Sequence, residues 1–311
     1  MKAPVSLLLA ALLLAACQDK PAAEPAKPVA EKSSRADSEN QDQAAEETTE
    51  AEEVAEEAQD DASDSAHSGA VKQFVAAGKR VKQALADGED ADKLYGKHRA
   101  EVEKILEKIN EEQAKFLEGF IDKSDAERRS EQKKIAAAGL QYVDMGEAIT
   151  EVAPANDYYL KLFGKHADDA LKGFLELQAK DGADPISNDG ALALEWDELA
   201  QRIAAWEDWE MEYPDSPRQK DARKVLTEYR HAYLFGMDNT PVADFDENGK
   251  AGKLESAVDK SWARVSDKRP DSETAKLISE ARKYWKARQS SDEPDLAGYS
   301  GPFKQLRQEQ Y

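Results

Sequence analysis

WDELAQRIAAWEDWEMEYPDSPRQKDARKVLTEYRHAYLF, residues 196–235, decides the fold class. Apolar side chains recur every three or four positions, which is typical of an amphipathic helix, at Leu192, Trp196, Leu199, Ile203, Trp206 and Tyr213. Pro214-Asp215-Ser216 then interrupts this pattern. Proline fixes φ, and an Asp or Ser oxygen can accept from the free N–H groups of a following helix. The stretch therefore predicts a helix, a tight turn and a second helix folded back on the first.

The same arrangement recurs 56 residues later. Trp262 corresponds to Trp206, and Pro270-Asp271-Ser272 corresponds to the first turn. The apolar positions also correspond: Trp209 with Val265, Ala222 with Ile278, Val225 with Ala281, and Tyr229 with Trp285. The segment from Tyr213 to Pro217 resembles the turn of tetratricopeptide-like repeats, which occur in bacterial envelope lipoproteins. Those repeats recur at about 34 residues, and the loop from Gly236 to Lys253 accounts for the longer spacing. The resemblance implies a groove that binds peptides or proteins.

Apolar residues recur every three or four positions across residues 70–290, so we predict helices and no strands there. Ser124 and Glu127 form a capping-box pattern, and the helix that they start is expected to carry Ile135, Tyr142, Met145 and Ile149 on one face. We therefore predict an all-α fold of antiparallel helical hairpins. Residues 69–190 form a helical bundle, residues 191–290 continue it as hairpin repeats, and residues 291–311 are an irregular tail.

Residues 17–68 differ sharply from this helical part. Residues 36–64 contain 13 Asp or Glu and no Lys or Arg, so they cannot bury enough apolar surface to fold alone. We predict a disordered acidic tether that spaces the folded part from its anchor. Residues 65–311 keep a net charge of −10, which argues against a nucleic-acid partner, because phosphate binding needs a basic surface.

The N-terminus predicts an exported protein. A basic Lys2 precedes the apolar run Val5 to Leu14, which is too short to span a bilayer and suits a signal peptide over residues 1–16. Leu14-Ala15-Ala16-Cys17 resembles the bacterial lipobox, and Cys17 is the one cysteine of the chain. The resemblance implies acyl chains on Cys17, which would anchor the protein stably to a membrane. Since Gln18 replaces the Asp that often retains such proteins at the inner membrane, the outer membrane is favoured, at its periplasmic face or at the cell surface.

One loop carries metal-binding chemistry. Residues 244–255 fit the EF-hand string, so Ca²⁺ ligands would be Asp244, Asp246, Asn248, the carbonyl of Lys250, and Glu255. Two features depart from that motif: Ala251 occupies a position that is usually large and apolar, and Pro241 lies where an entering helix is needed. The alternative is a polar turn, with Glu255 at the start of the next helix.

Few residues suggest catalysis. The chain has four histidines, His67, His98, His166 and His231, and lacks the sequence motifs of common hydrolases and nucleotide-binding enzymes. His98 and His166 are expected within helices as structural residues, and Glu228-x-x-His231 is half of a di-iron pattern without a second copy. The leading hypothesis is a non-enzymatic interaction or scaffold module that binds an envelope protein. A calcium-binding protein and an enzyme with an unrecognised site are the alternatives.

Overall fold

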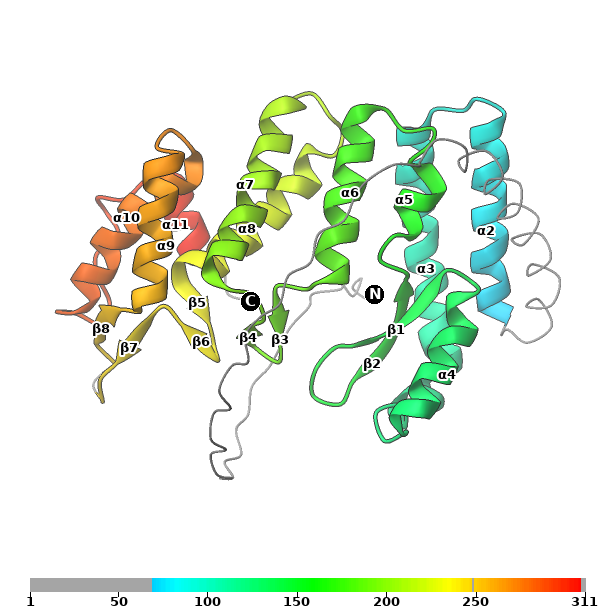
Figure 1. Ribbon diagram of the computed structural model, residues 1–311, viewed down its shortest axis with the longest axis horizontal. Helices are drawn as coiled ribbons and strands as arrows, with labels where there is room; N and C mark the ends of the chain where they lie inside the picture. Colours follow the sequence, from blue (N-terminus) through cyan, green and yellow to red (C-terminus); the bar gives the residue numbers. More distant parts are fainter. Residues whose placement is uncertain (1–68, 248, 309–311) are drawn as a thin grey trace, which may run out of the picture. The chain divides into compact units, whose positions relative to one another are not determined.

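The computed structural model describes residues 69–308 except residue 248, and 63% of these residues are helical and 10% are in strands. The predicted signal peptide, Cys17 and the acidic tether lie outside the described residues. The mostly helical class agrees with the sequence prediction. Figure 1 shows the ten helices of the described part, which are α2 (Gly69–Ala86), α3 (Ala91–Glu118), α4 (Asp125–Ala136), α5 (Tyr158–Phe163), α6 (Asp169–Ala183), α7 (Trp196–Glu212), α8 (Gln219–Phe235), α9 (Ser256–Lys268), α10 (Glu273–Arg288) and α11 (Gly301–Gln308).

Four short antiparallel hairpins, absent from the prediction, interrupt the helices. They are β1 (Leu140–Asp144) with β2 (Thr150–Pro154), β3 (Ser187–Asn188) with β4 (Ala191–Leu192), β5 (Gly236–Met237) with β6 (Thr240–Pro241), and β7 (Ala243–Phe245) with β8 (Ala251–Leu254). In Figure 1 all four lie along the lower side of the row of helices.

Helix α4 shows how local chemistry starts and ends an element. Ser124 and Glu127 form the predicted capping box, in which each side chain bonds the other residue's backbone N–H. The helix ends at Ala136, shortly before Gly139, whose φ of 78° suits glycine. The predicted helical face that continued to Ile149 is therefore wrong, because the chain turns back here as β1 and β2.

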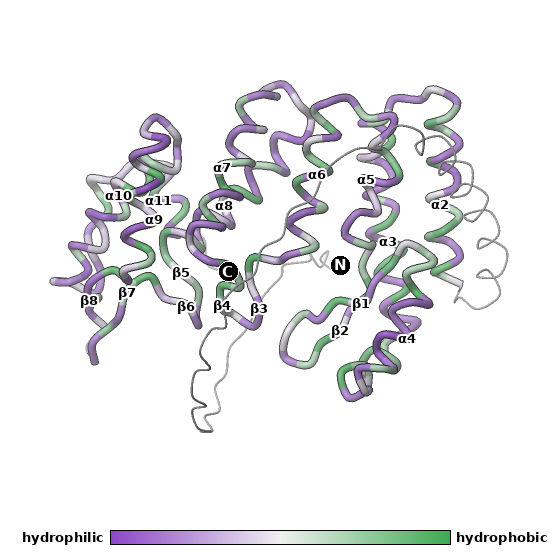
Figure 2. The backbone as a smooth tube through the Cα atoms, viewed as in Figure 1, coloured by the Kyte–Doolittle hydropathy of each residue, from purple (hydrophilic) through white to green (hydrophobic). Residues whose placement is uncertain are grey.

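The core consists of two apolar clusters. The smaller packs α2 against α3, α4 and the first hairpin, and the larger extends from α2 and α3 to α11. Figure 2 shows hydrophobic and hydrophilic residues alternating along the helices. All five tryptophans are at most 9% exposed, which confirms that they are core residues: Trp196, Trp206, Trp209, Trp262 and Trp285. Tyr229 is also buried, whereas Tyr213 is half-buried.

A buried carboxylate joins α7 to α8 and α10. Glu207 on α7 is 5% exposed and accepts hydrogen bonds from Arg230 Nη2 at 2.8 Å, Thr274 N at 2.9 Å and Thr274 Oγ1 at 2.7 Å. The Thr274 N–H belongs to the first turn of α10, which has no acceptor within its own helix. Glu207 therefore caps one helix while neutralising an arginine of another.

The sequence predicts an irregular C-terminal tail, but part of this tail is helical. Residues 301–308 form α11, which packs on α8 and α10 with Phe303 and Leu306 buried. Ser300 Oγ accepts from Phe303 N at 3.2 Å, and Pro302 occupies the first turn, where its missing N–H costs nothing. None of the helices in the described part is long and apolar enough to cross a membrane.

Candidate interaction surface

The calcium loop is a β-hairpin in the structure. Asp244 lies in β7, Lys250 directly precedes β8, and a turn joins the strands through Asp246 N to Lys250 O at 2.9 Å and Lys250 N to Asp246 Oδ1 at 3.0 Å. Glu255 immediately precedes α9, and Asn248 is not among the described residues. The residues before Asp244, where an EF-hand has its entering helix, form β5, β6 and the first residue of β7, and the calcium site stays a prediction. Across residues 69–308, apart from 248, no three His, Cys, Asp or Glu side chains are grouped to bind a metal.

The described histidines occupy structural positions. His98 on α3 is 1% exposed, its Nε2 lies 2.9 Å from Tyr158 Oη, and burial lowers its pKa to about 4. His166 is exposed in the turn between α5 and α6, so its predicted helical position is wrong. His231 packs on the ring of Phe235, and burial again lowers its pKa to about 4.

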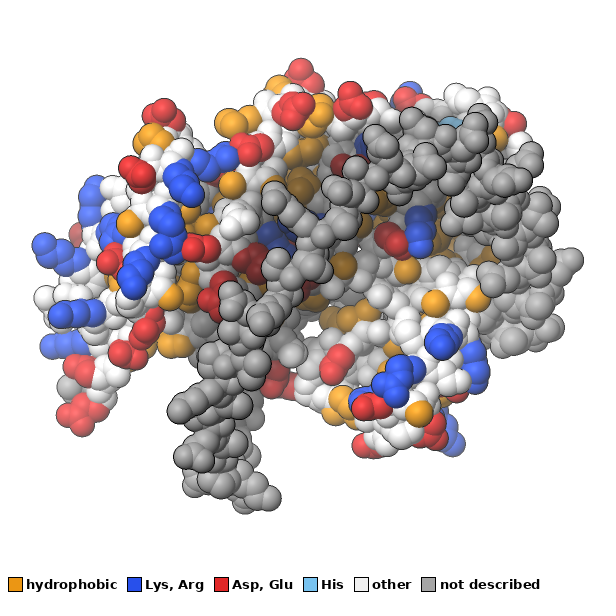
Figure 3. Space-filling model, viewed as in Figure 1, with side chains coloured by type: hydrophobic (Ala, Val, Ile, Leu, Met, Phe, Trp, Pro, Cys, Tyr) orange, Lys and Arg blue, Asp and Glu red, His pale blue; other side chains and the backbone are white. Residues whose placement is uncertain are grey.

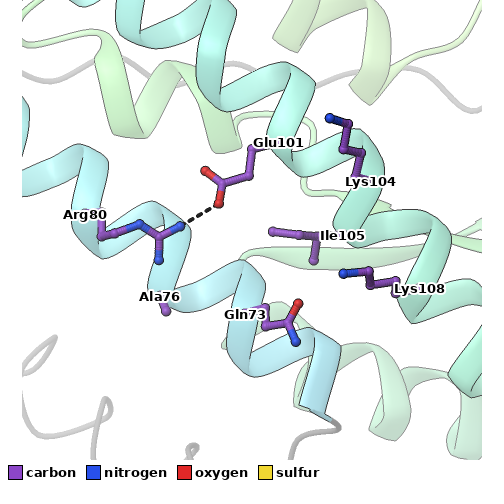
Figure 4. A pocket seen from close by; sticks show the side chains of 7 residues that line it. All are labelled: Gln73, Ala76, Arg80, Glu101, Lys104, Ile105 and Lys108. Carbon is purple, nitrogen blue, oxygen red and sulfur yellow. Dashed lines mark hydrogen bonds and ion pairs between the residues drawn. The ribbon is translucent and has the colours of Figure 1, made fainter.

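A first hollow, of about 290 Å³, lies between α2 and α3 (Figure 4). Gln73 and Arg80 project from α2 towards Glu101 and Ile105 of α3, and an ion pair of 2.6 Å joins Arg80 to Glu101. Ala76, Lys104 and Lys108 complete the lining of this hollow. The lining thus holds no histidine, cysteine or hydroxyl group that could serve as an activated nucleophile.

A second hollow, of about 350 Å³, lies beside the turn between α7 and α8. Four carboxylates line it, from Asp92, Asp168, Glu212 and Asp215. Several are already engaged: Asp168 accepts from Leu171 N at 2.8 Å, and Asp92 lies 3.2 Å from Arg218 Nε. Asp168 therefore caps a helix and Asp92 pairs with an arginine, both within the fold.

The four hairpins together form the most distinctive surface of the described part, which we call the hairpin edge (residues 140–154, 187–192, 236–241 and 243–254). The first three hairpins touch one another. A Cβ atom at Gly146 would lie 3.9 Å from Asp189 Oδ1, and Asn239 donates from its backbone N to Gly190 O at 3.0 Å. Asn239 Nδ2 also donates to Asp189 O at 2.7 Å. Hydrogen bonds therefore join the second and third hairpins, and the Asp189 side chain of the second lies near Gly146 of the first.

The hairpin edge is acidic. Its first three hairpins contain five Asp or Glu and no Lys or Arg, and the fourth adds three acidic residues and two lysines. Seven of these carboxylates are exposed: Asp144, Glu147, Asp189, Asp238, Asp244, Asp246 and Glu247. Figure 3 shows acidic side chains gathered at the free end of the β7–β8 hairpin. Helix α2 has the opposite character, with four basic residues and no acidic ones.

The hairpin edge also holds exposed apolar side chains. Four large hydrophobic residues are exposed in the described part, and three of them lie on this edge: Met145 (40%), Ile149 (52%) and Phe245 (48%). The fourth, Met211, lies near the end of α7. Phe245 is covered on one side by the guanidinium of Arg288, at 5.6 Å from its ring. Met145 and Ile149, which flank one turn, are the two exposed large hydrophobic residues of the first hairpin.

The tip of the first hairpin has a constrained backbone. Gly146, Glu147 and Ala148 have φ values of 84°, 51° and 62°. The left-handed region costs a non-glycine residue about 1 kcal/mol. Met145 N donates to Ile149 O at 2.8 Å, which fixes the two apolar residues at the base of this turn. Strain of this kind is concentrated at functional sites, where the rest of the structure maintains it.

Side chains of α3 and α4 form hydrogen bonds with the backbone of the first hairpin. Val152 N donates to Asn110 Oδ1 at 2.8 Å, and Asn110 Nδ2 donates to Val152 O at 3.3 Å, so one amide satisfies the outer edge of β2. Tyr142 N donates to Gln132 Oε1 at 3.0 Å. The exposed tip is thus supported by hydrogen bonds from two helices.

Comparisons of the chain with protein-family models, with curated proteins and with solved structures found no match.

Proposed function

We propose that the protein is a lipid-anchored, non-enzymatic interaction module of the bacterial cell envelope, which binds another protein through its helical part. The hairpin edge is the observation that carries the interaction role. Three of the four exposed large hydrophobic residues of the described part lie there, and two of them, Met145 and Ile149, lie on the hairpin that α3 and α4 hydrogen-bond. Contiguous exposed apolar patches that polar residues surround mark protein-binding sites.

The anchoring part of the proposal rests on the sequence. The lipobox-like segment ending at Cys17 supplies an acylation site, and residues 18–68 supply a spacer. A flexible chain of about fifty residues has an r.m.s. span of about 40 Å, which would hold the helical part clear of a membrane. The outer membrane remains the favoured location, because Gln18 follows the cysteine.

We also propose that α7–α8 and α9–α10 are two copies of one tetratricopeptide-like unit. Three of the five corresponding pairs have matching burial: Trp206 and Trp262 are both 0% exposed, Ala222 and Ile278 are both 0% exposed, and Tyr229 and Trp285 are 7% and 6% exposed. Ser272 caps α10 by accepting from Ala275 N at 3.1 Å, as the Pro-Asp-Ser turn predicts. Repeated units of this kind are stable, stacked supports for a binding surface.

Anchoring is tested by comparing the wild-type chain with Cys17→Ala. The wild type should incorporate radiolabelled palmitate and sediment with membranes, whereas Cys17→Ala should do neither. Equal membrane recovery without label would contradict the anchor.

The interaction role is tested by crosslinking in the intact envelope, followed by identification of the adducts by mass spectrometry. The proposal expects one protein to be captured reproducibly by the wild-type chain. Recovery of the uncrosslinked chain alone, from cells in which it is correctly located, would contradict a protein-binding role.

A further inference from the structure

From the hairpin edge we infer that the partner is a protein surface with an apolar pocket rimmed by Lys and Arg, and that the pocket receives Met145 and Ile149. This inference rests on the proposed function and specifies which surface of the chain binds and what chemistry it meets.

The first step is apolar. Met145 and Ile149 are 40% and 52% exposed, and they lie at the base of the tightest turn of the hairpin. Met and large aliphatic groups at the centre of an interface contribute most when they fill a dry pocket. Because Asn110 and Gln132 hold the hairpin, little conformational entropy is lost when the tip docks.

The second step is electrostatic. Asp144, Glu147 and Glu151 flank the two apolar residues, Asp189 reaches the same tip from the next hairpin, and residues 135–160 contain no Lys or Arg. Charge complementarity therefore requires a cationic rim on the partner. The same charges repel the anionic phosphates of nucleic acid and of lipid headgroups. A protein surface with an apolar pocket and a cationic rim complements both the apolar and the acidic side chains of the tip.

The experiment places a photoreactive benzoylphenylalanine at position 149 of the full, lipidated chain in its native envelope. A second chain carries the same group at position 211, because Met211 is 70% exposed and lies on α7 rather than on the hairpin edge. We expect a protein adduct from position 149 whose crosslinked peptide contains Lys or Arg beside apolar residues.

Charge is tested on the position-149 chain with the triple substitution Asp144→Asn, Glu147→Gln and Asp189→Asn. Each replacement keeps an acceptor oxygen, and Asn tolerates the positive φ of residue 189. We expect the adduct yield to fall at least about tenfold, equivalent to about 1.4 kcal/mol of binding. The matched control neutralises three exposed carboxylates of α3, with Glu107→Gln, Glu111→Gln and Glu118→Gln, and should leave the yield unchanged.

The outcomes separate the two proposals. An adduct from position 211 alone would overturn the hairpin inference and leave the interaction role standing. Adducts from neither position, with the chain correctly located, would count against both. A lipid adduct at position 149, or a protein adduct that survives neutralisation of the tip, would overturn the cationic partner.

Discussion

Replacing Glu207 by alanine should destabilise the helical part strongly, although the residue is far from the hairpin tip. The substitution leaves the Arg230 guanidinium, whose side chain is 13% exposed, without its partner at 2.8 Å. It also leaves the N–H and hydroxyl of Thr274 without their acceptor. Breaking a buried ion pair from one side costs about 3–5 kcal/mol, because the remaining charge stays buried.

The expected effect is therefore a loss of about 3–4 kcal/mol in the free energy of unfolding. For a domain of this size, each kcal/mol lowers the melting temperature by about 2–4 °C, so Tm should fall by about 10 °C. Glu207→Gln should lose about half as much free energy, about 2 kcal/mol, because its amide oxygen still accepts from Thr274.

The assay is urea unfolding followed by tryptophan fluorescence. The tryptophans are all buried in the unit that Glu207 holds together, so their emission reports its unfolding. Urea is preferred to guanidinium, whose ions would screen the charges under study. Glu210→Ala is the matched control on the same helix, because it removes only a surface ion pair with Arg223, worth less than about 1 kcal/mol. A Glu207→Ala protein within 1 kcal/mol of the wild type would refute this account of how α7 joins α8 and α10.

Stability should fall as the pH is lowered from 6.5 towards 4, because His98 and His231 have their pKa lowered to about 4 by burial and bind protons only after unfolding. His98 alone accounts for about 3 kcal/mol of this loss, and urea titrations at several pH values in which His98→Gln fails to flatten the slope would contradict it. Gly236→Ala should cost more than about 2 kcal/mol, because its Cβ would meet Thr240 O at 2.7 Å, whereas Gly88→Ala has open space and should cost about 1 kcal/mol; equal melting temperatures would be the adverse result. If residues 244–255 form only a polar turn, millimolar Ca²⁺ should leave the melting temperature unchanged, whereas a calcium site there should give a rise that Glu255→Gln abolishes.

Much of the helical architecture follows from the sequence, since three-and-four spacing, the capping box at Ser124 and the Pro-Asp-Ser turn each have a local cause. The first hairpin was missed for a physical reason. Residues 135, 142, 145 and 149 fit a helical period, while β1 is too short for alternation to outweigh it. Two glycines could have indicated the hairpin: Gly139, just before β1, and Gly146, in the turn between β1 and β2.

The hairpin edge itself could not be predicted from the sequence. Its charge is visible as stretches without Lys or Arg, but the proximity of Gly146 to Asp189, and the hydrogen bond of Asn239 to Gly190, depend on how distant helices pack. The tail helix had a readable signal, because Ser300 and Pro302 mark a helix start. The calcium string does not specify the elements on either side of it, so the strands that precede Asp244 could not be predicted from it.

The position of α11 has a consequence for how the chain is made. Phe303 lies in an aromatic group with Phe235, Tyr284 and Tyr299, so α11 supplies part of the core. Until α11 leaves the ribosome, α8 and α10 expose the apolar surface that it covers. A chain cut before residue 301 would therefore keep this surface exposed and would be a substrate for proteases and chaperones.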